Sequence, residues 1–305
     1  MSERKAVVVT HQRVRSSSIV TEALNQLKSS GFSVSIVDNS EAPAFGEPYQ
    51  QVDPDTEIVI VLGGDGTILR AAELVKCTGV PILGVNLGHV GFLAEFESFQ
   101  IGEAMSKVAA HDYSIEERMV AHVDLWLPGA DKPLTDWALN DMTLERYSRG
   151  KMVEVSLRVD DVEMSSYGCD GIIVATPTGS TAYAFSAGGP IVWPDAQSLQ
   201  MVPIAAHALF ARSLVIGPQS TYTIGLLDDS PSDGWICCDG RRQLLVPKGS
   251  RVTVRQSHDI FHLARLSGAS FTQRLVSKFD LPVVGWREQH HPNLSAKRGQ
   301  EARDA

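Results

Sequence analysis

The residues with the clearest capacity for chemistry lie in a glycine-rich segment near residue 65. Gly63-Gly64-Asp65-Gly66-Thr67 follows the apolar run 58–62 and precedes an apolar stripe at helical spacing. Glycines let a backbone approach a ligand closely, and a helix N-terminus presents N–H groups and a positive dipole end to phosphate. A carboxylate repels phosphate, so Asp65 needs another purpose, such as holding Mg²⁺ or accepting a proton from a hydroxyl. The alternative is an ordinary strand–helix turn in which Asp65 caps the helix.

A second segment, residues 170–190, combines hydroxyl side chains with glycines after another apolar run. Its hydroxyl donors are Thr176, Thr178, Ser180 and Thr181. Tyr183 adds a flat ring that can stack on a base and still form a hydrogen bond. The pattern predicts a turn and then a short helix that ends at Gly188-Gly189-Pro190. A serine/threonine turn that caps a helix would explain each hydroxyl singly, but not the whole run.

The elements that must position these segments change in character near residue 118. Strand-like runs alternate with helical stripes up to about residue 115, which predicts an open, mostly parallel α/β sheet. Short alternating or β-branched runs follow up to residue 268, which predicts a β-rich, sandwich-like domain. We expect an α/β domain over 1–117, a β-rich domain over 118–268, a C-terminal segment over 269–287 that packs back on the first domain, and a frayed tail over 288–305.

The composition is that of an ordinary globular protein and excludes several function classes. Hydrophobic residues make up 43% of the 305 residues, and the formal net charge is −9. This charge argues against a general binder of nucleic acid or of anionic membranes. No apolar run is long enough to cross a bilayer, and no signal-peptide core is present. The four cysteines show neither a CxxC pair nor zinc-ligand spacing, so we expect reduced thiols in a cytoplasmic protein.

Both segments resemble signatures of known kinases. Residues 63–67 are similar to a signature shared by NAD kinases, diacylglycerol and sphingosine kinases and, more loosely, 6-phosphofructokinases, which implies phosphoryl transfer to a hydroxyl. Residues 170–190 closely match a second NAD kinase signature that the lipid kinases lack. Further likenesses lie at Asn86-Leu87-Gly88, Gly91-Phe92-Leu93, Asn140-Asp141 and Cys238-Asp239-Gly240. The chain from residue 58 to about 286 therefore resembles the NAD kinase family.

The resemblance implies a reaction and a role for each matching residue. NAD kinases transfer the γ-phosphoryl group of ATP, or in some members a phosphoryl group of inorganic polyphosphate, to the 2′-hydroxyl of the adenosine ribose of NAD. Asp65 would be the general base. The phosphate or nucleotide loop would comprise Gly63, Gly64, Gly66 and Thr67. The NAD-binding residues would be Phe92, Asn140, Asp141, Asp170, Thr181, Ala182, Tyr183 and Ser186. Among these, Asn140 and Asp141 would hold the adenosine part and Asp170 the carboxamide end.

The resemblance also implies partners. Mg²⁺, or another divalent cation, would be carried by the donor phosphates, and no protein ligand is assigned to it. NAD kinases tend to form dimers and tetramers, so we expect a homodimer or homotetramer without nucleic-acid or membrane partners. The chain departs from the family pattern at Gly168, where many relatives are basic, and at Arg241, where many have glutamine. An exposed turn is the simpler interpretation of Arg241 and Arg242. Lys151 is placed near the ligand by its position in the sequence alone.

Two other functions stay open at this point. A lipid or sugar kinase could use the same glycine-rich turn, although the second signature and the lack of an apolar acyl-binding stretch count against it. A catalytically silent NAD(P)-binding sensor would bind nucleotide without turnover and would tolerate the loss of Asp65.

Overall fold

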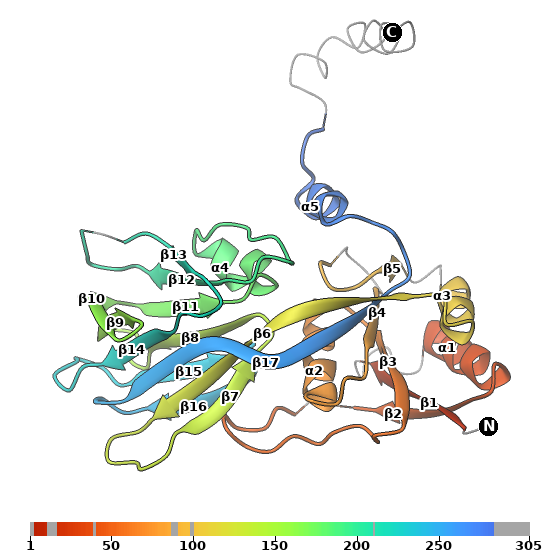
Figure 1. Ribbon diagram of the computed structural model, residues 1–305, viewed down its shortest axis with the longest axis horizontal. Helices are drawn as coiled ribbons and strands as arrows, with labels where there is room; N and C mark the ends of the chain where they lie inside the picture. Colours follow the sequence, from red (N-terminus) through yellow and green to blue (C-terminus); the bar gives the residue numbers. More distant parts are fainter. Residues whose placement is uncertain are drawn as a thin grey trace, which may run out of the picture.

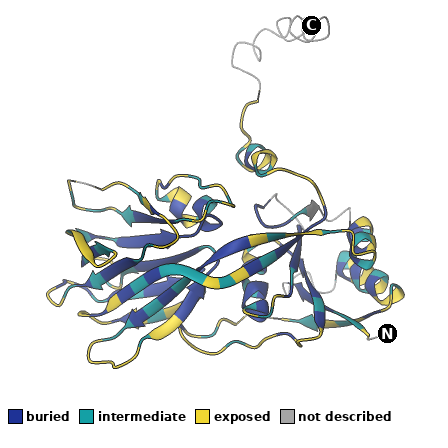
Figure 2. Cartoon of the chain, viewed as in Figure 1, coloured by how far each residue is buried: buried dark blue, intermediate teal, exposed yellow. Residues whose placement is uncertain are grey.

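The protein consists of an α/β part and a β-rich part joined by two long strands (Figure 1). The structure is a computed structural model, and it describes residues 3–10, 17–38, 41–86, 91–97, 101–209 and 211–283. Within these residues the strands form one sheet of 11 strands and a second sheet of six. The middle of most strands is buried, whereas the turns and the outer helix faces are exposed (Figure 2).

The α/β part has a parallel sheet in the order β2-β1-β3-β4, with helices on both faces. Ile60 packs with Leu27 and Met105 from the two helices α1 and α3 on one face, and Val59 packs with Ile68 from α2 on the other. This explains why the strands are apolar throughout. The elements are β1 (Arg4–Thr10), α1 (Ser18–Ser29), β2 (Phe32–Val37), β3 (Thr56–Leu62), α2 (Asp65–Val75), β4 (Ile82–Asn86), β5 (Phe96–Glu97) and α3 (Ile101–Ala109).

The β-rich part packs an antiparallel sheet, in the order β13-β12-β11-β8-β15-β16, against the rest of the larger sheet. Met142 and Ile172 of the smaller sheet meet Tyr222 and Val254 of the larger one in a single core. The elements are β6 (Ser114–Trp126), β7 (Leu134–Ala138), β8 (Asp141–Arg146), β9 (Val153–Val159), β10 (Val162–Cys169), β11 (Gly171–Ala175), a 3₁₀ turn (Gly179–Thr181), α4 (Tyr183–Ser186), β12 (Leu199–Ile204), β13 (Leu214–Ile216), β14 (Tyr222–Leu226), β15 (Gly234–Cys238), β16 (Arg242–Val246), β17 (Arg251–Arg265) and α5 (Phe271–Phe279).

The long strands β6 and β17 make the larger sheet continuous between the two parts. They pair antiparallel along their length, and Leu263 of β17 also pairs in parallel with Ile82 of β4. The fold class expected from the sequence, an α/β sheet followed by a β-rich sandwich, is therefore confirmed. The sequence pattern did not show that one sheet runs through both parts.

Helix α5 follows β17 and contacts both parts. The ring of Phe92 lies 6.0 Å from that of Phe271 and 5.7 Å from that of Phe279, and Phe279 lies 4.8 Å from Phe185 of α4. Ser270 and Gln273 form a capping box at its N-terminus. The C-terminal segment thus returns to the first part, as expected, but it also reaches the second.

Some expectations fall outside the described residues, namely those for residues 87–90, 284–287 and the tail 288–305. Where the structure describes the chain, none of its helices combines the length and the apolar character that a membrane span needs.

Candidate functional site

The glycine-rich turn lies between the C-terminal end of β3 and the first turn of α2. Gly64 is the N-cap, and α2 begins at Asp65. The Gly63 amide donates to the Val85 carbonyl of β4 at 2.9 Å, so Gly63 extends the sheet. We expected this amide to bind a phosphate oxygen, and that expectation is wrong. Gly64 and Gly66 are exposed. Among the described residues, no acceptor meets the amides of Gly64, Asp65 or Gly66, which leaves the helix N-terminus open to phosphate oxygens.

The Asp65 carboxylate turns away from its own helix and does not cap it. Its Oδ2 accepts the Phe92 amide at 2.9 Å, and its Oδ1 accepts the amides of Leu93 and Ala94 at 3.1 and 3.4 Å. Gly91 permits this approach, because a Cβ there would lie 2.2 Å from Oδ1. An ionised carboxylate has about four acceptor positions. Among the described residues, three amides fill three of these positions. The segment 91–94 therefore fixes the direction of Asp65, and no described residue fills the remaining position on Oδ2, which could accept from a hydroxyl.

The remaining expected residues gather around the six-stranded sheet, because antiparallel pairing brings distant corners to one edge. Asp141, the first residue of β8, pairs with Ala175 at the end of β11, and Met142 pairs with Cys238 at the end of β15. The turns after β11 and β15 therefore lie beside the start of β8. This register is the reason that the second signature meets the Asn140-Asp141 pair.

Asp239 and Gly179 lock this corner together. Asp239 has a φ of +54° and accepts the amides of Leu139, Asn140 and Asp141 at 3.0, 2.7 and 3.4 Å. A Cβ at Gly179 would lie 2.0 Å from the Asn140 carbonyl oxygen, so only glycine fits. The Asn140 side-chain Oδ1 is buried and accepts no hydrogen bond within the described part of the chain, which leaves it available to a ligand donor.

Asp141 is a buried carboxyl at this corner, with 6% of its surface exposed. Burial, together with the nearby Asp239 and Glu145 carboxylates, raises the pKa of Asp141 to about 7. It shares a sheet face with Ile173, which packs under Ala184 of α4. A ribose diol that donates to Asp141 would favour its ionised form.

Asp170 and Tyr183 line a hollow of about 460 Å³ near the other end of β8 and β11. Asp170 pairs with Arg146 at 2.9 Å. Gly171 pairs with Glu145, four strand positions from the Ala175–Asp141 pair, which corresponds to about 13 Å along the strand. Burial and the carboxylates of Glu145, Asp141 and Asp170 raise the pKa of Tyr183, which is 41% exposed. The hollow is lined by Glu145, Arg146, Tyr147, Arg149, Asp170, Tyr183, Ile204 and Trp235.

The hydroxyls of the second signature serve the turn itself. Thr176 Oγ1 donates to the Leu139 carbonyl, Ser180 Oγ to the Pro177 carbonyl at 2.7 Å, and Thr181 Oγ1 to the Thr178 carbonyl at 3.3 Å. The alternative of a serine/threonine turn, which explains each hydroxyl singly, therefore describes these three side chains. Ala182 leads into α4 and Ser186 is exposed at its end, but neither residue lines the hollow that contains Tyr183.

Phe92 is a packing residue that links the two turns. It is 7% exposed, donates its amide to Asp65 and contacts Phe279, which contacts Phe185 two positions after Tyr183. The 460 Å³ hollow does not include Asp65. Ring contacts through Phe279 of α5 therefore connect the segment that holds Asp65 with α4, which contains Tyr183.

Arg241 and Arg242 do not form an exposed turn, which corrects the expectation. The Arg242 side chain is fully buried and pairs with Glu73 at 3.0 Å, Asp136 at 3.1 Å and Asp239 at 2.9 Å. Arg241 also pairs with Glu73, at 2.9 Å. Since Glu73 belongs to α2, these ion pairs connect the helix that starts at Asp65 with the Asp239 corner. The sequence offered no sign of this connection. Lys151, which only its position suggested near the ligand, is exposed in a turn.

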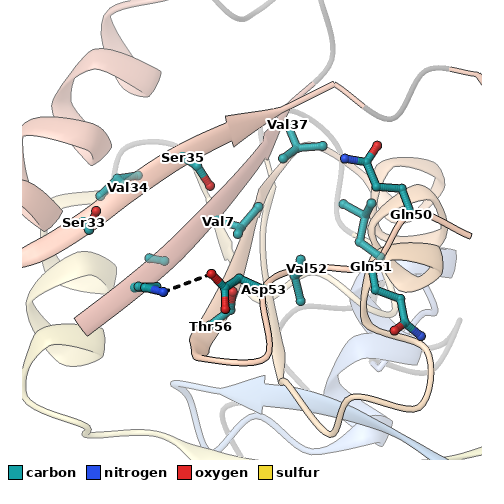
Figure 3. A pocket seen from close by; sticks show the side chains of 13 residues that line it. Val7, Ser33, Val34, Ser35, Val37, Gln50, Gln51, Val52, Asp53 and Thr56 are labelled. Atoms are coloured by element: carbon teal, nitrogen blue, oxygen red, sulfur yellow. Dashed lines mark hydrogen bonds and ion pairs between the residues drawn. The ribbon is translucent and has the colours of Figure 1, made fainter. Parts of the chain in front are cut away.

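A different hollow, of about 310 Å³, lies beside β1 and β2 and contains no residue expected at the site (Figure 3). Lys5 and Asp53 form an ion pair of 2.9 Å across it. Within the described ranges, no group of three or more histidine, cysteine or acidic side chains could hold a metal ion.

Comparisons with known proteins agree with this arrangement. The profile described as ATP-NAD kinase N-terminal domain matches residues 8–113, and that described as ATP-NAD kinase C-terminal domain matches residues 139–266. A protein of Bifidobacterium longum subsp. infantis named NAD kinase is 69% identical over 97% of this chain and 88% of its own length. The NAD kinase of Thermobifida fusca is 50% identical over 79% of this chain and 74% of its own length.

Two solved structures share the fold. An NAD kinase from Archaeoglobus fulgidus in complex with ATP has a TM-score of 0.69 and 27% identity over 90% of this chain and 98% of its own. Yeast NADH kinase complexed with NADH has a TM-score of 0.78 and 21% identity over 92% of this chain and 89% of its own, a likeness of fold alone.

Proposed function

This chain belongs to the NAD kinase family and is an enzyme that phosphorylates NAD to NADP, and we propose which of its residues carry out the steps. The observation that supports the proposal most is the environment of Asp65. Three backbone amides orient its carboxylate, and no other described residue fills its remaining acceptor position. Ring contacts through Phe279 of α5 also connect Phe92 of this segment with Phe185 of α4, the helix within the second signature.

NAD would lie along the outer face of the six-stranded sheet. Asp141 would accept hydrogen bonds from the adenosine ribose, and the free Oδ1 of Asn140 would accept from the adenine amino group. Tyr183 would stack on a base, and Asp170 would accept from the carboxamide about 13 Å further along the strands. A dinucleotide in an extended form could reach both ends. Thr181, Ala182 and Ser186 would line its side.

Asp65 would act as the general base. The ribose 2′-hydroxyl donates to the open position on Oδ2, and its proton passes to Asp65 as the 2′-oxygen bonds to the γ-phosphorus. The bond from the γ-phosphorus to its bridging oxygen breaks, and ADP leaves. Amides at the start of α2, including those of Gly64 and Gly66, would hold phosphate oxygens. A general base contributes about 10²–10⁴-fold to such a step.

ATP is the phosphoryl donor that we propose, because the family profiles carry its name and a relative was solved in complex with it. When bound, Mg²⁺ or another divalent cation supplies charge neutralisation to the donor phosphates. The site offers open amides and the Asp65 carboxylate beside them, which fits a cation carried by the donor. Inorganic polyphosphate as donor, a homodimer or homotetramer, a cytoplasmic location, and a boundary near residue 118 are predictions from the sequence.

The pure protein incubated with NAD, Mg²⁺ and either ATP or polyphosphate tests this proposal. We expect NADP, detected with an NADP-specific dehydrogenase, and a phosphate on the 2′-oxygen by ³¹P NMR. Diacylglycerol in place of NAD is the matched alternative acceptor. Phosphorylated lipid without NADP would overturn the assignment, and NAD binding without turnover would favour a silent sensor.

A further inference from the structure

Three arginines meet two glutamates at the junction between the two parts of the molecule. Arg118 of β6 pairs with Glu116 at 2.6 Å, and Arg265 at the end of β17 pairs with Glu116 and, at 3.2 Å, with Glu95. Arg274 of α5 also pairs with Glu95 at 3.2 Å and lies 3.9 Å from Glu116. The cluster, which we call the arginine cluster, therefore carries one more positive than negative charge.

The arginine cluster has donors that its carboxylates do not satisfy. The Nε atoms of Arg118 and Arg274 and the Nη2 atom of Arg265 are buried and donate to nothing in the described part of the chain. The Arg118 and Arg265 side chains are only 3% and 5% exposed. Buried donors without a partner are rare in native proteins, so each calls for a missing acceptor.

The two glutamates differ in how firmly the protein holds them. The Glu95 side chain is fully buried, and it also accepts the amides of Leu266 and Ser267 at 3.1 and 2.9 Å. The Glu116 side chain is 28% exposed, and its partners within the described part of the chain are arginines alone. Glu116 can therefore give way to another anion at the open side of the cluster, while Glu95 holds the rest in place.

The arginine cluster touches both turns of the proposed site. Arg265 Nη1 donates to the Leu93 carbonyl at 2.9 Å, and the amide of Leu93 holds Asp65. On the other side, Arg118 Nη1 donates to Thr178 Oγ1 of the second signature at 3.4 Å. Burial, together with the neighbouring cations Arg265 and Arg274, lowers the pKa of Arg118 to about 10, although the Glu116 carboxylate acts to raise it. An additional anion would relieve this excess of positive charge.

We propose that Arg118, Arg265 and Arg274 form an anion subsite that takes a phosphate group of the phosphoryl donor, in competition with Glu116. The assignment of the phosphate to the donor rests on the proposed function, whereas the anion subsite itself does not. The guanidinium groups suit it because they bind phosphate through two parallel hydrogen bonds. The subsite places positive charge next to the segment 91–94, which orients Asp65. In the proposed reaction, the bond between the γ-phosphorus and the ribose 2′-oxygen forms beside Asp65.

Two variants with opposite expected effects test the subsite. Arg274→Gln removes a cation from helix α5 and should weaken the binding of ATP and of inorganic tripolyphosphate about tenfold. Glu116→Gln removes the competing anion and should tighten both several-fold. NAD affinity should stay within about twofold in each variant. Lys278→Gln, which removes the same charge from an exposed position of the same helix, is the matched control and should change none of these constants.

Titration calorimetry of the full-length protein with each ligand alone provides these constants without turnover. A cluster that only stabilises the fold would lower the melting temperature in both variants and leave ATP and tripolyphosphate affinity unchanged, which would overturn the proposal. A loss of NAD affinity in Arg274→Gln would assign the anion to the acceptor and also overturn it. Tripolyphosphate binding with the expected pattern, but without NADP formation, would uphold the subsite and refute the proposed function.

Discussion

If Asp141 binds NAD as proposed, its buried carboxyl should make NAD binding depend on pH near neutrality. Its pKa is raised to about 7 by burial and by the carboxylates of Asp239 and Glu145. If the ribose diol donates to Asp141, the ionised carboxylate is the form that binds NAD. Lowering the pH through 7 protonates Asp141 and should weaken NAD binding.

The size of the effect follows from that pKa. Asp141 is about nine-tenths ionised at pH 8 and about one-tenth at pH 6. An apparent dissociation constant scales inversely with the fraction of protein that is competent to bind. The dissociation constant for NAD should therefore rise about tenfold between pH 8 and pH 6. Cys237 and Tyr183 also face this carboxyl, but their raised pKa values keep them neutral over this range.

Calorimetric titration of NAD between pH 5.5 and 8.5, without ATP, measures this dependence and avoids the titration of ATP itself. Asp141→Asn should bind more weakly and show no slope, because its amide does not ionise. Glu145→Gln should move the transition to lower pH, because it removes a like charge that raises the pKa of Asp141. A flat profile for the unmodified protein, or an unchanged slope in Asp141→Asn, would refute the reasoning.

Three further substitutions probe the contacts that position the site. Gly91→Ala puts a Cβ 2.2 Å from the Asp65 carboxylate and should lower kcat about 10²-fold or more. Steady-state kinetics measures kcat, and an unchanged circular dichroism spectrum would show that the variant is folded. Gly179→Ala forces the second signature away from Asn140 and should raise the KM for NAD more than that for ATP; equal KM values for the variant and the parent would contradict this. Arg242→Met leaves buried carboxylates unpaired and should lower the free energy of unfolding by about 3–5 kcal/mol, as urea denaturation would show.

The local features of the site could be predicted from the sequence, because they depend on neighbouring residues. The apolar run 58–62 and the glycines after it predicted a strand, a turn and a helix start, and the structure has them. The role expected for the Gly63 amide was wrong, because that amide pairs with Val85, a residue of the next strand. Pairing between strands decides which amides stay free, and a turn sequence does not contain that information.

The long-range contacts could not be predicted in the same way. Arg242 follows a polar turn, and its partners Glu73 and Asp136 lie 169 and 106 positions earlier in the chain. Nothing in a single sequence links such positions, so an exposed turn was the simpler expectation. The C-terminal segment was expected to return to the first domain, but only the structure shows that Phe271 and Phe279 of α5 contact Phe92.

The central claim is that Asp65 accepts the proton of the NAD ribose while other residues bind the nucleotide. Asp65→Asn keeps the size of the side chain, and its amide oxygen can still accept the amides of Leu93 and Ala94. The basic carboxylate is removed, and the Phe92 amide loses its acceptor. A paired measurement of NAD affinity and of NADP formation in a single turnover tests this claim. We expect NAD affinity within about threefold of the parent and a rate lower by about 10²–10⁴-fold. Single-turnover NADP formation at the parent rate would contradict the account.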